Sequence, residues 1–595
     1  MRRRGYGALA LVTAATLVLA GCGAESGETE QTPGATDGAV EEAEGEDVEG
    51  LDEAEDLVSE YPREETVFTS GAQWGPPSSW NPIPGSGEAT GVRGLLYEPL
   101  FLFDPSTLEF EPWLAESGEW VSDSVYEVTL RDNLVWSDGE ALDAADVVFT
   151  IELGLQPEVP WSNVWTWLDS AEAVDDLTVR YTFSDPRYEE WDNFLYTNYV
   201  VPEHIFGEWS EGDYLSNQNT DPVGSGAYLY STSASDRMVW ERNDNWWGID
   251  ALGMEMPARY IVDIVNPSNE VALGLMLQGS MDLSNNFLPG INTLVDSGQV
   301  ETYYSEAPYM LSANTAVLVP NTLREPLDDA AFRQALAYSV NVDQIVTGAY
   351  SNIVQAAHPS GLLPAFSDYY DESVADELGF NYDADQARQV LADAGYEDTD
   401  GDGFVETPDG EAIELSLIVP AGWTDWMEAA RVIAESAQAV GINVVADYPD
   451  SGAVDDARAT GDFDLLINNY SQVSNTPWTW YNYLFYQPIQ EQMLTGNFGR
   501  YENDEAWALV QDLSRTDRSD AEYMEIMSEL QEITMTDLPM IPLWYNGLWA
   551  QYSNAVWTNW PTDAADTPSA YPSTWGGYFS MGGIHTLASI VPAGG

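Results

Sequence analysis

The residues best suited to bind an ion lie in one acidic, glycine-rich segment, residues 398–409. Its acidic residues fall at loop positions 1, 3, 5 and 9, with glycine at position 6. This spacing matches the calcium loop of an EF-hand, although Asp409 stands at position 12, where the motif has a bidentate glutamate. The pattern fits either a structural calcium site or a solvated acidic turn. The predicted ligand set is Asp398, Asp400, Asp402, Phe404 (through its backbone carbonyl), Glu406 and Asp409.

A second segment, residues 465–490, has the chemistry of a neutral binding surface. It contains no acidic or basic residue, although it belongs to a chain with 100 acids. Seven aromatic residues and four asparagines lie within it. Aromatic rings can stack on the apolar faces of a sugar, and amides can hydrogen-bond to its hydroxyls. The segment therefore favours an uncharged, hydroxyl-rich ligand over an ion.

Several kinds of chemistry are excluded by composition. All 19 basic residues are arginine, so the chain has neither a phosphate-loop lysine nor a Schiff-base lysine. The three histidines, His204, His358 and His585, are far apart and form no HExxH pair. A net charge of −81 repels the phosphate backbone, so we expect no nucleic-acid partner. The same charge predicts self-repulsion that salt would screen, and hence a halophilic protein.

Cys22 is the single cysteine, and it ends a short N-terminal segment. Three arginines, an apolar run and the small residues before Cys22 are typical of an export signal at residues 1–22. The ending Leu-Ala-Gly-Cys resembles the lipobox of bacterial lipoproteins, which implies lipidation of Cys22. Residues 23–65 are rich in acids and poor in aromatic residues, which predicts a disordered acidic tether. We therefore expect an extracytoplasmic protein, anchored to the cell membrane by lipid.

Strand and helix patterns alternate along the rest of the chain, which indicates an α/β architecture. Strand-like alternation begins at Val67 and Phe68, and Asp143 is placed to cap a helix that runs to Leu153. The other expected helices are 330–345, 384–394, 426–440 and 521–534, and the other expected strands are 126–130, 177–183, 414–419 and 443–445.

Ordered motifs cover nearly all of residues 66–595. They begin with Leu-Tyr-Glu-Pro-Leu at 96–100 and Glu-Pro-Trp-Leu-Ala-Glu-Ser at 111–117. Further matches are at 126–133, 135–140, 146–149, 221–228, 333–336, 391–396, 463–465 and 538–543. Together they resemble the family 5 extracellular solute-binding proteins of ABC importers, which handle oligopeptides, dipeptides, nickel and some oligosaccharides.

The resemblance implies a two-lobed, periplasmic-binding-protein-like type II fold with an extra domain and a ligand cleft between the lobes. It also implies a monomer that delivers its solute to the membrane subunits of an ABC permease, with no cofactor required. By analogy, lobe I combines residues 66–108, 222–318 and 545–595, the extra domain is 109–221, and lobe II is 319–544.

The resemblance also suggests where the ligand binds. Peptide-binding relatives have an aspartate in the region of residues 465–490, and this chain has no acid there, which favours an oligosaccharide over an oligopeptide. Segments around 73–82 and 284–290 resemble the sugar-binding branch. The expected ligand-binding residues are Trp74, Trp80, Asn81, Asn286, Phe287, Trp423, Trp426, Asn469, Tyr470, Trp478 and Trp480. For each aromatic residue, burial in the core is the competing interpretation.

Two other functions remain open at this point. A secreted glycoside hydrolase needs two carboxylates across the sugar, and 100 acids would allow many pairs. A ligand sensor would close in the same way as a transport protein but signal to a receptor. We predict a transport binding protein without catalytic residues.

Overall fold

The computed structural model describes residues 61–70, 73–84, 87–469, 473–564, 570–571 and 583–594. All of them fall within one compact unit, Val48–Gly595. Cys22, the predicted signal, the tether up to residue 60 and Tyr470 lie outside the described residues. Among the described helices, none has the length and apolar character needed to cross a bilayer.

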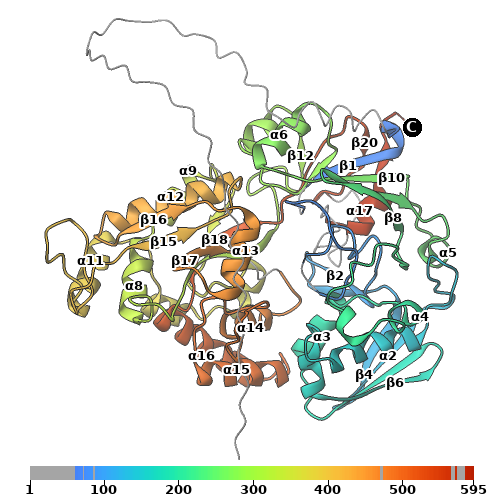
Figure 1. Cartoon of the computed structure of the whole chain (residues 1–595), viewed down its shortest axis with the longest axis horizontal. Coiled ribbons are helices and arrows are strands. Elements are labelled where there is room, and N and C mark those ends of the chain that lie inside the picture. Colours follow the sequence, from blue (N-terminus) through green and yellow to red (C-terminus); the bar gives the residue numbers. More distant parts are fainter. Residues whose placement is uncertain are drawn as a thin grey trace, which may run out of the picture. The chain divides into compact units, whose positions relative to one another are not determined.

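Two large mixed sheets organise the described residues (Figure 1). In the first, β1 (Thr66–Ser70) lies parallel to β10 and β11, and antiparallel strands extend both sides. Its order is β12 (Glu301–Thr302), β19 (Gln551–Tyr552), β11 (Leu283–Ser284), β1, β10 (Tyr260–Ile264), β9 (Arg237–Arg242) and β8 (Tyr228–Ala234).

The second sheet has a parallel centre as well, because β15 (Leu415–Ile418) lies parallel to both β16 and β17. Its order is β14 (Gln355–Ala356), β18 (Ile541–Gly547), β13 (Ser312–Pro320), β17 (Leu465–Asn468), β15 and β16 (Val444–Asp447). The predicted lobe boundaries at 318/319 and 544/545 fall inside β13 and β18, and both strands belong wholly to this sheet. The chain crosses between the sheets from β12 to β13 and from β18 to β19.

A four-stranded antiparallel sheet forms within the segment predicted as the extra domain. Its order is β4 (Ala115–Ser122), β5 (Val125–Leu130), β7 (Thr178–Phe183) and β6 (Leu168–Asp175). Two separate two-stranded sheets pair β2 (Phe101–Asp104) with β3 (Glu109–Pro112) and β20 (Trp557–Thr558) with β21 (Val591–Pro592). The alternating burial of β5 and β7 confirms the period-two pattern of these two segments.

The helices of the described residues pack on these sheets or on one another. In the first-sheet and extra-domain regions they are α2 (Ala144–Glu152), α3 (Tyr188–Thr197), α4 (Glu203–Phe206), α5 (Trp247–Leu252), α6 (Asn269–Leu277), α7 (Ile291–Asp296) and α17 (Gly583–Ser589). In the second-sheet region they are α8 (Ala330–Ser339), α9 (Val342–Gly348), α10 (Glu372–Leu378), α11 (Ala384–Ala394), α12 (Thr424–Gln438), α13 (Ser451–Thr460), α14 (Trp478–Phe485), α15 (Asp504–Arg515) and α16 (Ala521–Asp537).

Helix caps explain where some of these helices begin. Asp143 caps α2 with a reciprocal capping box to Asp146, as the sequence predicts. The expected helix 330–345 is wrong as one element, because Val340 adopts an extended conformation and Asn341 caps a new helix, α9.

Residues 61–65 are packed, although the sequence assigns them to the tether. Arg63 pairs with the buried carboxylate of Asp282 at 2.6 Å, and that carboxylate also accepts a hydrogen bond from the amide of Phe68 at 2.9 Å. The ring of Tyr61 contacts that of Tyr260, with centroids 5.4 Å apart. A buried carboxylate needs a partner, so Arg63 ties this segment to the first sheet.

Candidate functional site

The carboxyl ends of the parallel strands bring one set of side chains together on each sheet. In the first sheet these are the residues that follow β1, β10 and β11; in the second they follow β15 and β17. We call these two sets the facing edges. In α/β sheets, ligands bind outside the carboxyl ends of the strands.

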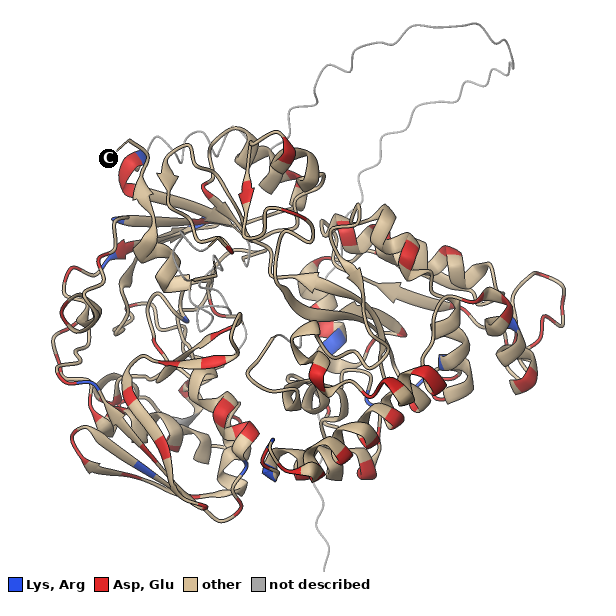
Figure 2. Cartoon of the chain, turned by 180° about the vertical axis from the view of Figure 1, so that it is seen from behind, with Lys and Arg blue, Asp and Glu red and all other residues tan. Residues whose placement is uncertain are grey.

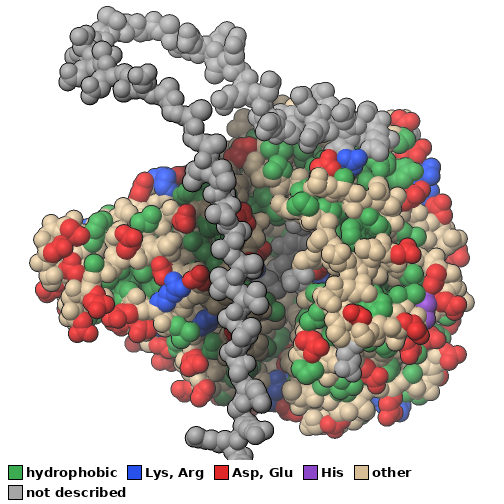
Figure 3. Space-filling model, in the orientation of Figure 1, with side chains coloured by type: hydrophobic (Ala, Val, Ile, Leu, Met, Phe, Trp, Pro, Cys, Tyr) green, Lys and Arg blue, Asp and Glu red, His purple; other side chains and the backbone are tan. Residues whose placement is uncertain are grey.

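Contacts between the two sets show that the edges face each other. The rings of Trp74 and Trp423 lie with centroids 5.2 Å apart and planes at 43°. The amide of Asn269, at the start of α6, donates to the carbonyl of Gly422 at 3.4 Å. Figure 3 shows the surface hollowed between the part that carries α8 and α11 and the part that carries α2 and α4.

Asp425, in the first turn of α12, strengthens this contact between the edges. It is 5% exposed, and its carboxylate accepts hydrogen bonds from Asn269 Nδ2 at 3.0 Å and from the Tyr350 hydroxyl at 2.9 Å. Burial raises the pKa of Asp425 to about 6, while the hydrogen bond from Tyr350 opposes this rise. The carboxylate therefore fixes the start of α12, and with it Trp423, against α6.

Several buried polar atoms at the facing edges have no hydrogen-bond partner among the described residues. They are Nδ2 and Oδ1 of Asn266, Oδ1 of Asn285, Nδ2 of Asn286, Nε1 of Trp423 and Oγ1 of Thr424. A buried polar group without a partner costs about 1–3 kcal/mol, so such groups are rare unless water or a ligand bonds to them. The atoms include donors and acceptors but no charge, which suits a ligand with hydroxyl or amide groups.

The structure keeps some predicted ligand residues at the facing edges. Trp74 and Trp423 are partly exposed, and Asn469, also partly exposed, directly follows β17. Asn286 accepts a hydrogen bond from Ser70 Oγ at 2.9 Å through its Oδ1.

Other predicted ligand residues are buried among core side chains, which favours the competing interpretation that they belong to the core. Trp80 packs on Tyr230, and both amide hydrogens of Asn81 are donated to loop carbonyls. Trp478 and Trp480 donate their indole N–H groups to the carbonyls of Val510 and Ser360. The side chains that the structure places in the core are Trp80, Asn81, Phe287, Trp426, Trp478 and Trp480.

Sequence reasoning missed Asn266 and Thr424 at the facing edges, and it included Asn285 only through the segment 284–290. Asn266 comes two residues after β10, and its backbone amide donates to the Gln73 carbonyl at 2.8 Å. Thr424 lies between the two tryptophans that the sequence did single out. The sequence feature that could have identified them is an asparagine or threonine that follows the end of a strand.

The acidic loop forms a separate cluster. Carboxylate oxygens of Asp398, Asp400, Asp402 and Glu406 all lie within 4.8 Å of one another. Asp409 is not a member of this group. Three members are exposed, whereas Glu406 is 6% exposed and accepts hydrogen bonds from the amide and hydroxyl of Thr399, both at 2.7 Å. Oxygen-only ligands at this spacing fit a hard cation such as calcium.

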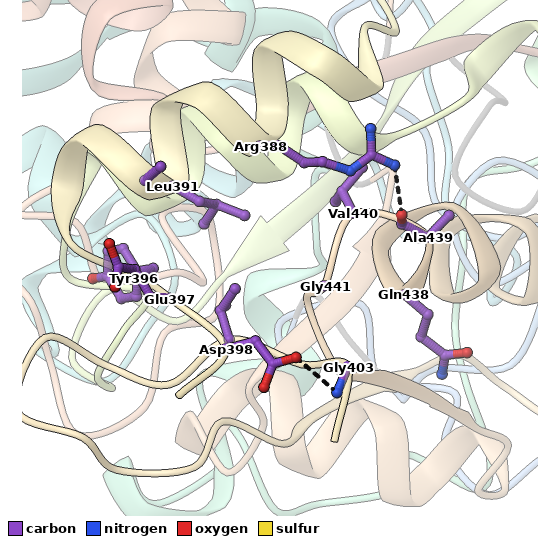
Figure 4. Close-up of a pocket in the computed structure, with 12 residues that line it drawn as sticks. Arg388, Leu391, Tyr396, Glu397, Asp398, Gly403, Gln438, Ala439, Val440 and Gly441 are labelled. Carbon is purple, nitrogen blue, oxygen red and sulfur yellow. Dashed lines mark hydrogen bonds between the residues drawn. The ribbon is translucent and has the colours of Figure 1, made fainter. Parts of the chain in front are cut away.

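A cavity of about 390 Å³ opens beside this loop (Figure 4). Arg388 of α11 crosses one wall and donates to the carbonyl of Ala439 at 2.8 Å, and Asp398 accepts from the amide of Gly403 at 3.1 Å. Its lining comes from α11, the end of α12 and the acidic loop, so the cavity is not part of the facing edges.

Solved structures define the class of fold. The structure superposes on a mannohexaose-bound periplasmic oligopeptide-binding protein of an oligopeptide ABC transporter from Thermotoga maritima with a TM-score of 0.88. The match covers 90% of this chain and all of the other, at 44% sequence identity. The fold is therefore the two-lobed α/β fold of the periplasmic binding proteins, as the sequence predicts.

The family follows from the sequence itself. Residues 109–492 match the model of the bacterial extracellular solute-binding proteins, family 5 Middle, and the chain belongs to this family. It is 25% identical to the oligopeptide-binding protein AppA of Bacillus subtilis over 79% of this chain and 84% of the relative. It is 24% identical to a periplasmic alpha-galactoside-binding protein of Rhizobium meliloti over 68% of this chain and 65% of the relative. These relatives are binding proteins and not enzymes, so the glycoside hydrolase alternative is set aside.

Proposed function

We propose that this protein captures an oligosaccharide between the facing edges and delivers it to the membrane subunits of an ABC importer. The observation that carries the proposal is the set of uncharged polar atoms at the facing edges that have no partner among the described residues, together with the Trp74–Trp423 pair. A sugar hydroxyl both donates and accepts hydrogen bonds, and the two rings offer faces for its apolar side. The relative of 44% identity with bound mannohexaose supports this ligand class.

The export signal, the lipidated Cys22 and the acidic tether belong to the same proposal. The family description is extracellular, and a lipid anchor would keep the binding protein near its permease. Cleavage before Cys22 is tested by mass spectrometry of the protein extracted from membranes. A mature chain without lipid at Cys22 would contradict the anchor and leave the binding function untouched.

A thermal-shift screen tests the ligand. Mannohexaose and cello- and xylo-oligosaccharides are compared with mixed tri- to pentapeptides, because a ligand that binds only the folded form raises its melting temperature. We expect a rise with at least one oligosaccharide and a smaller rise in Trp423→Ala at the same sugar concentration. Stabilisation by peptides alone would replace the sugar with an oligopeptide, the ligand class that AppA's name gives for that relative.

The acidic loop supports a second, structural proposal: it binds one calcium ion through Asp398, Asp400, Asp402 and Glu406. The ion would offset the mutual repulsion of four carboxylates whose oxygens lie within 4.8 Å of one another. This role is independent of the solute, because the loop lies outside the facing edges.

A further inference from the structure

The extra-domain region reaches the second-sheet region at α3, where Tyr196 belongs to the same buried core cluster as Trp478 and a set of charged contacts lies around it. Arg515, the last residue of α15, holds Asp185 with three hydrogen bonds of 2.7 to 2.9 Å. Arg187, just before α3, donates to the side-chain carbonyl of Gln511 on α15. We call this set of contacts, with those of Arg518 below, the α3 junction.

Arg518 forms the more buried half of the junction. Its guanidinium contacts Glu189 at 2.6 Å and Asp192 at 3.7 Å, both on α3. It also donates to the carbonyl of Asn475 at 3.0 Å. The side chain of Glu189 is only 3% exposed, so its charge depends on this arginine.

The composition of the chain makes this cluster unusual. The whole sequence has 19 basic residues against 100 acids, yet three arginines meet at this one junction. Many other ion pairs within the described residues are local, such as those of Arg431 with Glu428 and Glu435 on the same helix, or join distant segments within one region, such as that of Arg324 with Asp464. Three of the few basic residues therefore lie where two regions of the protein meet.

The position of the junction gives it a mechanical role. Figure 1 shows α3 beside α14 and α15, at the end of the molecule away from the crossings between the two sheets. The crossings join the two regions covalently, whereas at α3 only side-chain contacts join them. When two domains rotate about crossing segments, contacts far from the crossings must break as the domains separate.

Resting on the proposed solute-binding function, we propose that Arg515 and Arg518 are positioning residues for ligand capture. They hold the extra-domain region against α15 in the closed form and so slow the release of a solute held between the facing edges. Neither residue has to touch the solute. Closure that is favoured by added contacts lowers the rate of opening, and the apparent affinity rises in proportion to the closed population.

Arg515→Gln is the main test, because its partner Asp185 is 41% exposed and the substitution leaves no buried charge behind, unlike loss of Arg518, whose partner Glu189 is 3% exposed. Mannohexaose release is followed by stopped-flow tryptophan fluorescence of the full chain. We expect the release rate to rise at least about fivefold. Arg515→Lys keeps the charge without the bidentate geometry and should give an intermediate rate. Arg518→Gln should raise the release rate more than Arg515→Gln does. Arg431→Gln is the control: it removes the same charge, but from a pair within one helix, and should leave the release rate unchanged.

Two further measurements separate a positioning role from a structural one. In molar NaCl the difference between the wild type and Arg515→Gln should shrink, because salt screens an exposed pair. Small-angle scattering without sugar should show a larger radius of gyration for Arg515→Gln than for Arg431→Gln. A lower melting temperature of Arg515→Gln with an unchanged release rate and unchanged scattering would overturn the proposal. Should the wild type fail to bind mannohexaose, the sugar assignment falls, and the scattering comparison still decides the role of the junction.

Discussion

The ring of Trp74 lies against the ring of Trp423, with centroids 5.2 Å apart, although the two residues follow strands of different sheets. The pair therefore exists only while the facing edges are together. Nε1 of Trp423 is buried without a partner among the described residues, so this indole N–H can donate a hydrogen bond to a ligand.

Replacing Trp423 with alanine should weaken mannohexaose binding by about tenfold or more, which corresponds to about 1.4 kcal/mol. The reason is that both a stacking face and a free N–H donor are lost. Isothermal titration calorimetry measures the change. Trp507→Ala is the matched control, since Trp507 is also partly exposed and also paired, with Tyr486 at 5.6 Å, but on α15. Equal losses of affinity in both variants would contradict a specific role for Trp423.

Trp478→Ala should lower the free energy of unfolding. It should not remove a contact with the solute. Trp478 is 3% exposed in the core around α14 and donates its N–H to the carbonyl of Val510 at 3.2 Å. Removing a buried ring of this size costs about 3–5 kcal/mol of the free energy of unfolding. Chemical denaturation measures it, and Trp478→Phe, which keeps most of the ring, should lose less. If Trp478→Ala were as stable as the wild type but bound sugar more weakly, Trp478 would be a ligand-binding residue.

The contrast between these two tryptophans shows what the sequence could and could not predict. Segment 465–490 lacks charge, which suggested a neutral wall, but the cause is burial: α14 is buried on nearly every side. A helix that is apolar all round is a core helix. Periodicity gave helix 384–394 and the cap at Asp143 correctly, because both depend on local residues. Which aromatic side chains face the solute depends on how distant segments pack, and Trp74 and Trp423 are 349 positions apart in the numbering of the sequence.

Salt should raise the melting temperature of the protein. The net charge is −81, and Figure 2 shows acidic positions spread along the ribbon of the described residues with few basic positions between them. The Debye length falls from about 10 Å at 0.1 M to about 3 Å at 1 M salt, so repulsion between neighbouring carboxylates weakens. Differential scanning fluorimetry in NaCl, with sucrose at equal osmolality as control, separates screening from solute exclusion. A melting temperature that does not rise between low and molar NaCl would contradict a halophilic protein.

Raising the pH from 5 to 8 should lower the free energy of unfolding of the wild type more than that of Glu98→Gln. The carboxylate of Glu98 is fully buried and accepts hydrogen bonds from the indoles of Trp113, Trp246 and Trp247 at 2.8 to 3.1 Å. Burial raises the pKa of Glu98 from 4.5 to about 7, although these hydrogen bonds lower it. The folded form therefore binds a proton that the unfolded chain releases, so stability from this group is complete below pH 4.5 and is lost as the pH rises to about 7.

The readout for Glu98 is the difference in melting temperature between Glu98→Gln and the wild type at each pH. Glutamine cannot accept hydrogen bonds from all three indoles, so the variant should melt below the wild type at pH 5. Its melting temperature should then rise relative to that of the wild type as the pH increases to 8. Other titrating groups are common to both proteins and cancel. Glu109→Gln, at an exposed strand position, should show no such trend. A difference that stays constant with pH would mean that Glu98 ionises alike in the folded and unfolded chains.

Calcium should bind the acidic loop and raise the melting temperature of the protein. Four carboxylates whose oxygens lie within 4.8 Å of one another repel until a cation joins them. At a calcium concentration about 100 times the dissociation constant, the folded form gains about 2.7 kcal/mol. Calorimetric titration of the chelator-treated full chain measures binding. Asp400→Asn combined with Asp402→Asn should abolish both the heat and the thermal shift, whereas Asp409→Asn should keep them, because Asp409 is not in the group. Binding that is lost in Asp409→Asn would show that the loop rearranges to the full EF-hand ligand set, and no heat in the wild type would remove the site.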